Sequence, residues 1–129
     1  MTKVKAVVLT NTLGMSVEIL NYGARIKSIK FPVNGQPTEM VVGYPSAQEY
    51  INEPYYLGAT CGRVCNRISK GQFELDGVNY QLPKNDGENC LHGGIENYSM
   101  RYWQIDEQLL TESSVCLNLL SEDGDQGFP

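Results

Sequence analysis

The sequence lacks the features of a helical, membrane-bound or nucleic-acid-binding protein. Its 129 residues include only four alanines beside eight tyrosines and 13 glycines, a balance that favours strands and turns over helices. No apolar run approaches the roughly 20 residues that a membrane-spanning helix requires. The first ten residues lack the apolar core and cleavage site of a signal peptide, so we expect a cytoplasmic protein. Basic residues are few, ten against 15 acidic ones, and form no cluster, which argues against a nucleic-acid or membrane partner.

Cysteine and histidine are also scarce. The four cysteines are accompanied by a single histidine, and in a reducing cytoplasm we expect free thiols rather than disulfides. Cys61 and Cys65 are four positions apart, which is not a CxxC pair, and His92 is distant from them in sequence. We therefore expect no metal site, and read each cysteine as a small apolar residue.

Short stretches of strand character fill most of the chain. Between them lie glycine, proline and asparagine signals such as Asn34-Gly35, which predict turns. The segment 45–54 reads as a polar surface loop with room for one helical turn capped by Ser46. We expect strands at 4–9, 16–21, 24–31, 39–42, 102–105 and 115–119, and an extended, buried segment at 56–61.

The clearest single element is a hairpin around Asp76-Gly77. Apolar side chains alternate on both sides of this two-residue turn, at Phe73 and Leu75 before it and at Val78, Tyr80 and Leu82 after it. Short strands at close spacing predict an all-β sandwich or barrel.

The end of the sequence carries a strand without a successor. Residues 115–119 are followed by an acidic, glycine-containing turn at 121–127 and then by Phe128-Pro129. A turn that returns no strand leaves a sheet edge unpaired. We therefore expect residues 1–129 to be part of a larger domain, truncated at its C-terminal side, and expect the chain to self-associate.

Four polar residues stand out as candidates for chemistry. Arg63 and Arg67 flank a small, partly apolar stretch that contains Asn66, and His92 precedes two glycines. Judged singly, an arginine or asparagine here usually has a structural role, and a histidine serves structure or function equally well. Gly93-Gly94 removes side chains next to His92 and so permits a close approach.

Taken together, these residues form a specific string. It resembles the aldose 1-epimerase (galactose mutarotase) family, and the resemblance covers nearly the whole chain. The segments that carry it are Gly62-Arg63-Val64-Cys65-Asn66-Arg67-Ile68, Gly71 to Gly77, Tyr80-Gln81-Leu82, Asn85, Asn89 and Leu91-His92-Gly93-Gly94, with outlying matches at Asn21 to Ala24, Val42-Gly43, Asp123-Gly124 and Gly127 to Pro129.

The resemblance implies the N-terminal part of a large, mostly antiparallel β-sandwich of the galactose mutarotase type. It implies an enzyme that interconverts the α and β anomers of free aldohexoses such as galactose and glucose, without metal or organic cofactor. A base takes the C1 hydroxyl proton while an acid protonates the ring oxygen, and the ring opens and recloses on the other face.

The resemblance also assigns roles. Asn66 and Arg67 match the pair that contacts sugar hydroxyls, and His92 matches the first active-site histidine, which binds and positions the sugar. The main acid, a second histidine, and the base, a glutamate, are expected beyond Pro129, so we expect this chain alone to be inactive.

Two points stay open. The segment Ile95–Tyr102 departs from the family pattern before Trp103, which puts the cleft rim and the preferred sugar in question. The alternative to an enzyme is a non-catalytic carbohydrate-binding module that uses the same Asn66, Arg67 and His92 surface. A purely structural β domain fits the polar string less well.

Overall fold

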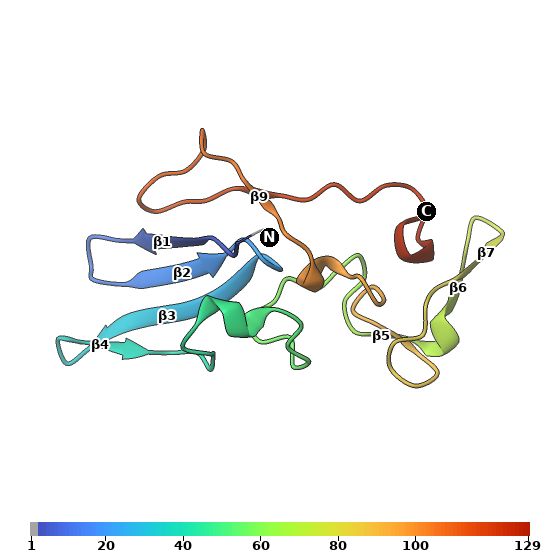
Figure 1. Cartoon of the computed structure of the whole chain (residues 1–129), viewed down its shortest axis with the longest axis horizontal. Helices are drawn as coiled ribbons and strands as arrows, with labels where there is room; N and C mark the ends of the chain where they lie inside the picture. Colours follow the sequence, from blue (N-terminus) through green and yellow to red (C-terminus); the bar gives the residue numbers. More distant parts are fainter. Residues whose placement is uncertain (1–2) are drawn as a thin grey trace.

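A four-stranded antiparallel sheet forms the N-terminal part of the molecule (Figure 1). The computed structural model describes residues 3–129. The strands β1 (Ala6–Thr10), β2 (Ser16–Leu20), β3 (Arg25–Val33) and β4 (Gln36–Glu39) lie side by side in chain order. Within the described residues there is no α-helix, and the predicted all-β class is confirmed. None of the described helical turns is long and apolar enough to cross a membrane.

Tight turns set the register of this sheet. Asn34 and Gly35 both have positive φ, 51° and 77°, and bring Gln36 directly opposite Val33. The strand predicted at 39–42 is therefore wrong by three residues, because pairing begins immediately after the turn. The apolar residues that motivated the prediction lie beyond the strand, and Val42 is 82% exposed.

The remaining elements are short. The predicted hairpin is confirmed as β6 (Gln72–Leu75) and β7 (Val78–Gln81), joined by Asp76 and Gly77 with φ of 51° and 78°. Ser46 caps a 3-10 turn, as predicted. The others are η1 (Ala47–Tyr50), β5 (Arg67–Ile68), η2 (Ser69–Gly71), β8 (Cys90–Leu91), η3 (Tyr98–Met100), β9 (Gln104–Ile105), β10 (Leu117–Asn118) and η4 (Asp125–Gly127).

The segment 56–61 is neither extended throughout nor buried, contrary to the prediction. It contains a turn at 57–58, Tyr56 and Gly58 have positive φ of 57° and 61°, and all six residues are exposed or half-buried. A Cβ at Gly58 would lie 2.0 Å from the carbonyl oxygen of Ile26, and the Ile26 amide donates to the Gly58 carbonyl at 2.8 Å. The segment is thus a loop whose backbone packs directly on β3.

The predicted C-terminal strands are present but shorter. β9 and β10 pair antiparallel over two residues each, Leu117 with Ile105 and Asn118 with Gln104. They form a two-stranded sheet, so each strand has a partner on one side only. This arrangement leaves open edges of the kind that the sequence predicted.

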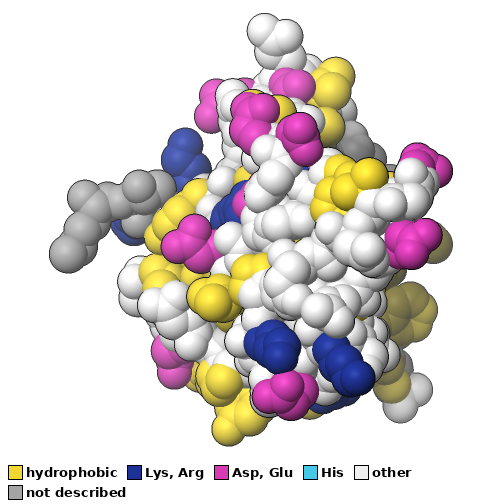
Figure 2. Space-filling model, turned by 90° about the vertical axis from the view of Figure 1, so that its right-hand side faces the viewer, with side chains coloured by type: hydrophobic (Ala, Val, Ile, Leu, Met, Phe, Trp, Pro, Cys, Tyr) yellow, Lys and Arg dark blue, Asp and Glu magenta, His cyan; other side chains and the backbone are white. Residues whose placement is uncertain are grey.

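Few apolar side chains are fully covered. A small core beneath the hairpin unites Leu82, Cys90 and Phe128, with Ile68 and Phe73 against it. Figure 2 shows hydrophobic side chains at the surface in several places, interspersed with acidic ones. The buried apolar residues are Leu20, Tyr22, Tyr50, Leu82, Cys90 and Phe128.

Candidate functional site

The pairing of β5 with β8 brings two of the predicted site residues together. Arg67 lies opposite Leu91 in this ladder, so Asn66 and His92 face each other one step beyond it. The His92 amide donates to the Asn66 carbonyl at 3.0 Å, and the Asn66 amide donates to His92 Nδ1 at 3.0 Å. Both residues have positive φ, 66° and 53°, a conformation that asparagine tolerates better than most residues. The reciprocal bonds hold these two turns in place.

Arg67 lies beside this pair and is exposed. Its amide donates to Asn66 Oδ1 at 2.9 Å, and its Nε donates to Asp86 Oδ2 at 2.6 Å. The Arg67 side chain keeps 55% of its surface accessible, and Asp86 engages Nε alone. The two terminal nitrogens of the guanidinium are therefore available to a ligand with several hydroxyl groups. Asp86 was not anticipated from the sequence.

Hydrogen bonding and partial burial both favour the neutral form of the His92 imidazole. Because Nδ1 accepts a backbone hydrogen bond, the proton of the neutral ring is on Nε2, which is then a donor. Partial burial lowers the pKa of His92, and the nearby positive charge of Arg67 lowers it further. The edge-to-face ring of Tyr56, with centroids 4.7 Å apart, covers one side of the imidazole.

The glycines after His92 make room for the protein's own chain. A Cβ on Gly93 would lie 2.0 Å from the carbonyl oxygen of Gly62, and one on Gly94 would lie 2.8 Å from Oε1 of Gln126. What approaches closely here is therefore the segment that begins the Arg-Asn-Arg string. Asn85 braces the same turn, since its side chain bonds the backbone of Leu91 twice and of Gly94 once.

Arg63 has a different role from Arg67. Its guanidinium donates to the Ser121 hydroxyl at 2.7 Å, to the Glu122 carbonyl at 2.9 Å and to the Pro129 carbonyl. It also lies over the ring of Phe128 at 5.8 Å. Arg63 thus anchors the C-terminal segment, while Arg67 remains at the surface.

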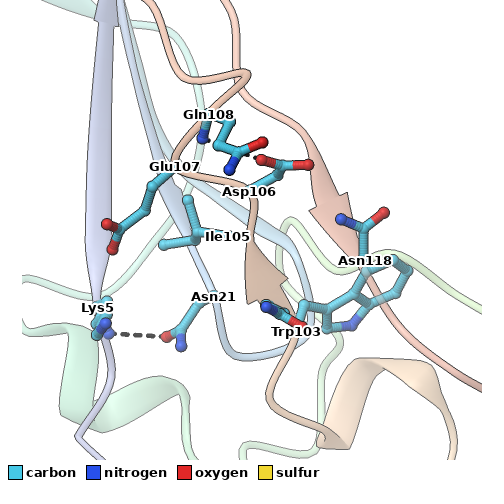
Figure 3. Close-up of a pocket in the computed structure, with 9 residues that line it drawn as sticks. Lys5, Asn21, Trp103, Ile105, Asp106, Glu107, Gln108 and Asn118 are labelled. Carbon is cyan, nitrogen blue, oxygen red and sulfur yellow. Dashed lines mark hydrogen bonds between the residues drawn. The ribbon is translucent and has the colours of Figure 1, made fainter.

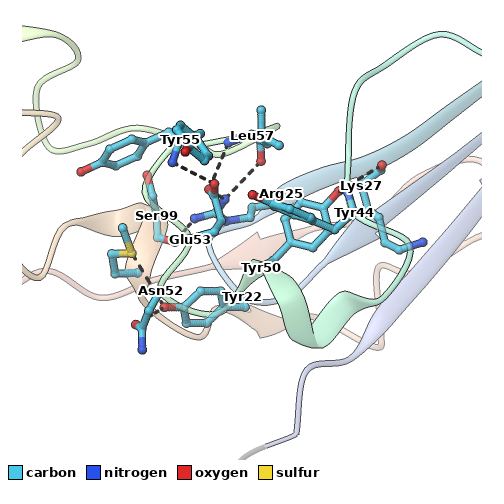
Figure 4. A network of polar contacts seen from close by, with 12 residues as sticks. Tyr22, Arg25, Lys27, Tyr44, Tyr50, Asn52, Glu53, Tyr55, Leu57 and Ser99 are labelled. Atoms are coloured by element: carbon cyan, nitrogen blue, oxygen red, sulfur yellow. Dashed lines mark hydrogen bonds and ion pairs between the residues drawn. The ribbon is translucent and has the colours of Figure 1, made fainter.

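A buried ion pair fixes the loop that carries Tyr56 (Figure 4). Arg25 pairs with Glu53, and their side chains are 0% and 2% exposed. Glu53 accepts from the amides of Tyr55 and Leu57 at 2.9 and 3.1 Å. Arg25 also donates to the carbonyl of Ser99 at 3.3 Å. The network ties β3 to the loop that carries Tyr56 and to the segment that carries Ser99, and it was not anticipated from the sequence.

An open groove of about 570 Å³ lies elsewhere, between the N-terminal segment and β9 (Figure 3). Its lining includes Lys5, Asn21 and Trp103, and none of the predicted site residues. Asn21 accepts two backbone hydrogen bonds: Oδ1 accepts from the Lys5 amide at 2.7 Å, and the carbonyl accepts from the Trp103 amide at 2.7 Å. The role of Asn21, which matches the family string, is therefore structural.

The unusual segment Ile95–Tyr102 packs beneath the His92 turn. Asn97, 1% exposed, caps η3 and donates to the Gly94 carbonyl at 2.8 Å. A Cβ on Gly62 would lie 2.2 Å from the ring of Tyr98. The inner part of this segment supports the site, whereas Ile95 is 63% exposed at its edge.

Two cysteines join His92 in space. Ligand atoms of Cys61, Cys65 and His92 all lie within 4.8 Å of one another. His92, although distant from the cysteines in sequence, is therefore close to them in space, contrary to the expectation from the sequence. Burial raises the pKa of the Cys61 thiol, and all four thiols are free.

Comparison with known proteins agrees with this architecture. The aldose 1-epimerase family profile matches residues 5–129. The aldose 1-epimerase of Haemophilus influenzae is 43% identical over 123 residues, which are 95% of this chain and 35% of that protein. The galactose 1-epimerase of Lactobacillus acidophilus superposes with a TM-score of 0.83 at 32% identity, over 99% of this chain and 37% of that one.

An aldose epimerase homologue from C. elegans superposes with a TM-score of 0.90 at 28% identity, over 97% of this chain and 38% of that one. The chain thus spans about a third of the length of the relatives that it matches. Its β architecture is that of galactose mutarotase-like proteins. By its sequence and its fold, the chain belongs to the aldose 1-epimerase family.

Proposed function

We propose that the complete protein is an aldose 1-epimerase acting on free aldohexoses such as galactose and glucose. In this proposal Asn66, Arg67 and His92 hold the sugar by its hydroxyl groups. The observation that carries it is the reciprocal bonding of Asn66 and His92, which presents the Nε2 proton of a neutral imidazole next to an exposed guanidinium.

This donor set suits a sugar better than a charged substrate. Vicinal hydroxyls accept from a fork of donors at fixed spacing, which the two terminal nitrogens of Arg67 supply. The Asp86 carboxylate accepts a hydrogen bond from Arg67 Nε, which orients the guanidinium, and its negative charge reduces the local positive charge. A neutral imidazole at ordinary pH adds a donor without adding charge.

The proposed reaction transfers protons and breaks and re-forms the bond between C1 and the ring oxygen, without a change of oxidation state, so no cofactor is proposed. A base removes the C1 hydroxyl proton, an acid protonates the ring oxygen, and the C1 carbonyl rotates before the ring closes. In our proposal the acid is a histidine and the base a glutamate, both supplied by sequence following Pro129, because His92 is the only histidine of these 129 residues. We further propose that the enzyme works in the cytoplasm, where its free thiols stay reduced.

Kinetics of the complete protein test the assignment. We expect kcat/KM for α-galactose to fall about 2- to 10-fold in His92→Ala and about 10- to 100-fold in Arg67→Ala, because lost hydrogen bonds to charged donors cost more. Lys84→Ala removes an exposed cation near the site and is the control. Near-normal kinetics in both site variants would show that these residues do not bind the sugar, and binding without turnover would favour the carbohydrate-binding module.

A further inference from the structure

The cluster of Cys61, Cys65 and His92 has the dimensions of a metal site. Cys65 Sγ lies 3.9 Å from His92 Nδ1, and all three ligand atoms lie within 4.8 Å of one another. A tetrahedral zinc ion with Zn–S and Zn–N bonds of about 2.3 and 2.0 Å needs ligand atoms about 3.5 to 3.8 Å apart. Shifts of an ångström or less would therefore close the three ligands around a cation.

The fold holds the two halves of the cluster together without any ion. The cysteines come from the segment before β5, and His92 comes from the turn after β8. Gly62 lies between the two cysteines in sequence, and Gly93 packs directly on its backbone. The contact is so close that a larger residue at position 93 would clash with the Gly62 carbonyl. The β5–β8 ladder and the hydrogen bond from the His92 amide to the Asn66 carbonyl fix the other side. A preformed cluster of this kind loses little conformational entropy when it binds a ligand.

We propose that Cys61, Cys65 and His92 bind a thiophilic divalent cation, Zn²⁺ or Cd²⁺. Two thiolates and an imidazole are soft ligands that select such ions over Mg²⁺ or Ca²⁺. Two thiolates neutralise the charge of the cation, so the filled site is compatible with the guanidinium of Arg67 nearby. Cys65 is exposed and provides the entry path, and a water completes the tetrahedron.

Cation binding has a consequence for the neighbouring backbone. The lone pair on His92 Nδ1 now accepts from the Asn66 amide, and a metal bond needs the same lone pair. The cation and this hydrogen bond therefore exclude each other, so the bound ion releases the contact that orients His92. Cation binding by this cluster is independent of the proposed sugar chemistry, and the experiments that test it use no sugar.

The first test is a titration of the reduced 129-residue chain with Cd²⁺, in which the thiolate-to-cadmium charge-transfer absorbance reports binding. We expect one Cd²⁺ per chain. Cys61→Ser and Cys65→Ser should each weaken binding at least tenfold and remove about half of the band, whereas Cys116→Ser, a half-buried thiol elsewhere, should leave both unchanged. Unchanged binding in Cys65→Ser, or an equal loss in Cys116→Ser, would overturn the proposal.

Alkylation of the unsubstituted chain is the second test, and it does not depend on any variant folding. With peptide-resolved mass spectrometry, saturating Zn²⁺ should slow iodoacetamide labelling of Cys61 and Cys65 at least tenfold and leave Cys116 unaffected. Equal labelling of Cys65 with and without Zn²⁺ would overturn the site, as would equal protection of Cys116.

Discussion

Among the single residues, His92 has a protonation equilibrium that its surroundings shift. Burial and the charge of Arg67 lower its pKa below the ordinary 6.5. The folded state therefore disfavours the protonated ring, and this contribution to stability is complete above pH 6.5 and is lost as pH falls through 6.5 toward the folded pKa. An NMR titration of the imidazole should give a pKa below 6.5.

Removing the neighbouring charge tests the cause of that shift. Arg67→Leu should move the pKa of His92 part of the way toward 6.5, because burial is the larger cause and remains. Lys30→Gln on β3 is the control and should leave the pKa unchanged. A titration at or above 6.5 in the unsubstituted protein would contradict the hydrogen bond from the Asn66 amide to His92 Nδ1.

At the scale of elements, the Arg25–Glu53 pair joins β3 to the loop that carries Tyr56. Leaving one buried charge without its partner typically costs about 3 to 5 kcal/mol. Arg25→Met or Glu53→Gln should therefore lower the free energy of unfolding by about that amount in urea titrations. Lys27→Met breaks the more exposed Lys27–Glu18 pair on the same sheet and should cost less than about 1 kcal/mol. Equal effects of the two pairs would refute the structural role of the network.

The C-terminal turn is held by a second pair, Arg101 with Asp125, through two bonds of 2.6 Å. The Arg101 guanidinium and the Ser121 hydroxyl lower the pKa of Asp125 to about 2 from 3.8. A lowered carboxyl pKa gives stability that is present above pH 3.8 and lost as pH falls toward 2, on the order of 2 kcal/mol.

Substitution of Asp125 tests this predicted loss of stability at acidic pH. Asp125→Asn should destabilise the chain at neutral pH and should flatten the loss of stability between about pH 4 and pH 2. Urea unfolding across pH is the measurement, with Asp123→Asn, an exposed neighbour, as the control. If the acid loss of stability were the same in Asp125→Asn as in the unsubstituted chain, the pair would not have this role.

Local signals predicted the elements that local chemistry determines. The Asp76-Gly77 hairpin and the Ser46 cap needed only residues adjacent in sequence. The prediction for the segment 56–61 was wrong because contact with Ile26, over 30 positions away in sequence, determines the backbone conformation there. Asn66, Arg67 and His92 were recognised from a family string, but their bonding to Asp86 and Tyr56 and the approach of the cysteines depend on tertiary packing.

At the scale of the whole molecule, many apolar groups remain uncovered. Leu13, Val42 and Leu120 are 80%, 82% and 76% exposed, and β10 has a partner on one side only. Open edges and apolar patches favour association. We expect the 129-residue chain to self-associate, with a mass that rises with concentration in light scattering coupled to size exclusion. A cooperatively unfolding monomer at every concentration would contradict this.

We propose that Asn66, Arg67 and His92 position a sugar, while the main acid and base lie outside residues 1–129. Polarimetry of freshly dissolved α-galactose with the 129-residue chain tests this division. Since each positioned acid or base typically contributes about 10²- to 10⁴-fold, the chain should leave mutarotation at its uncatalysed rate. A saturable, protein-dependent acceleration that survives repeated purification would show that the catalytic groups are already present within residues 1–129.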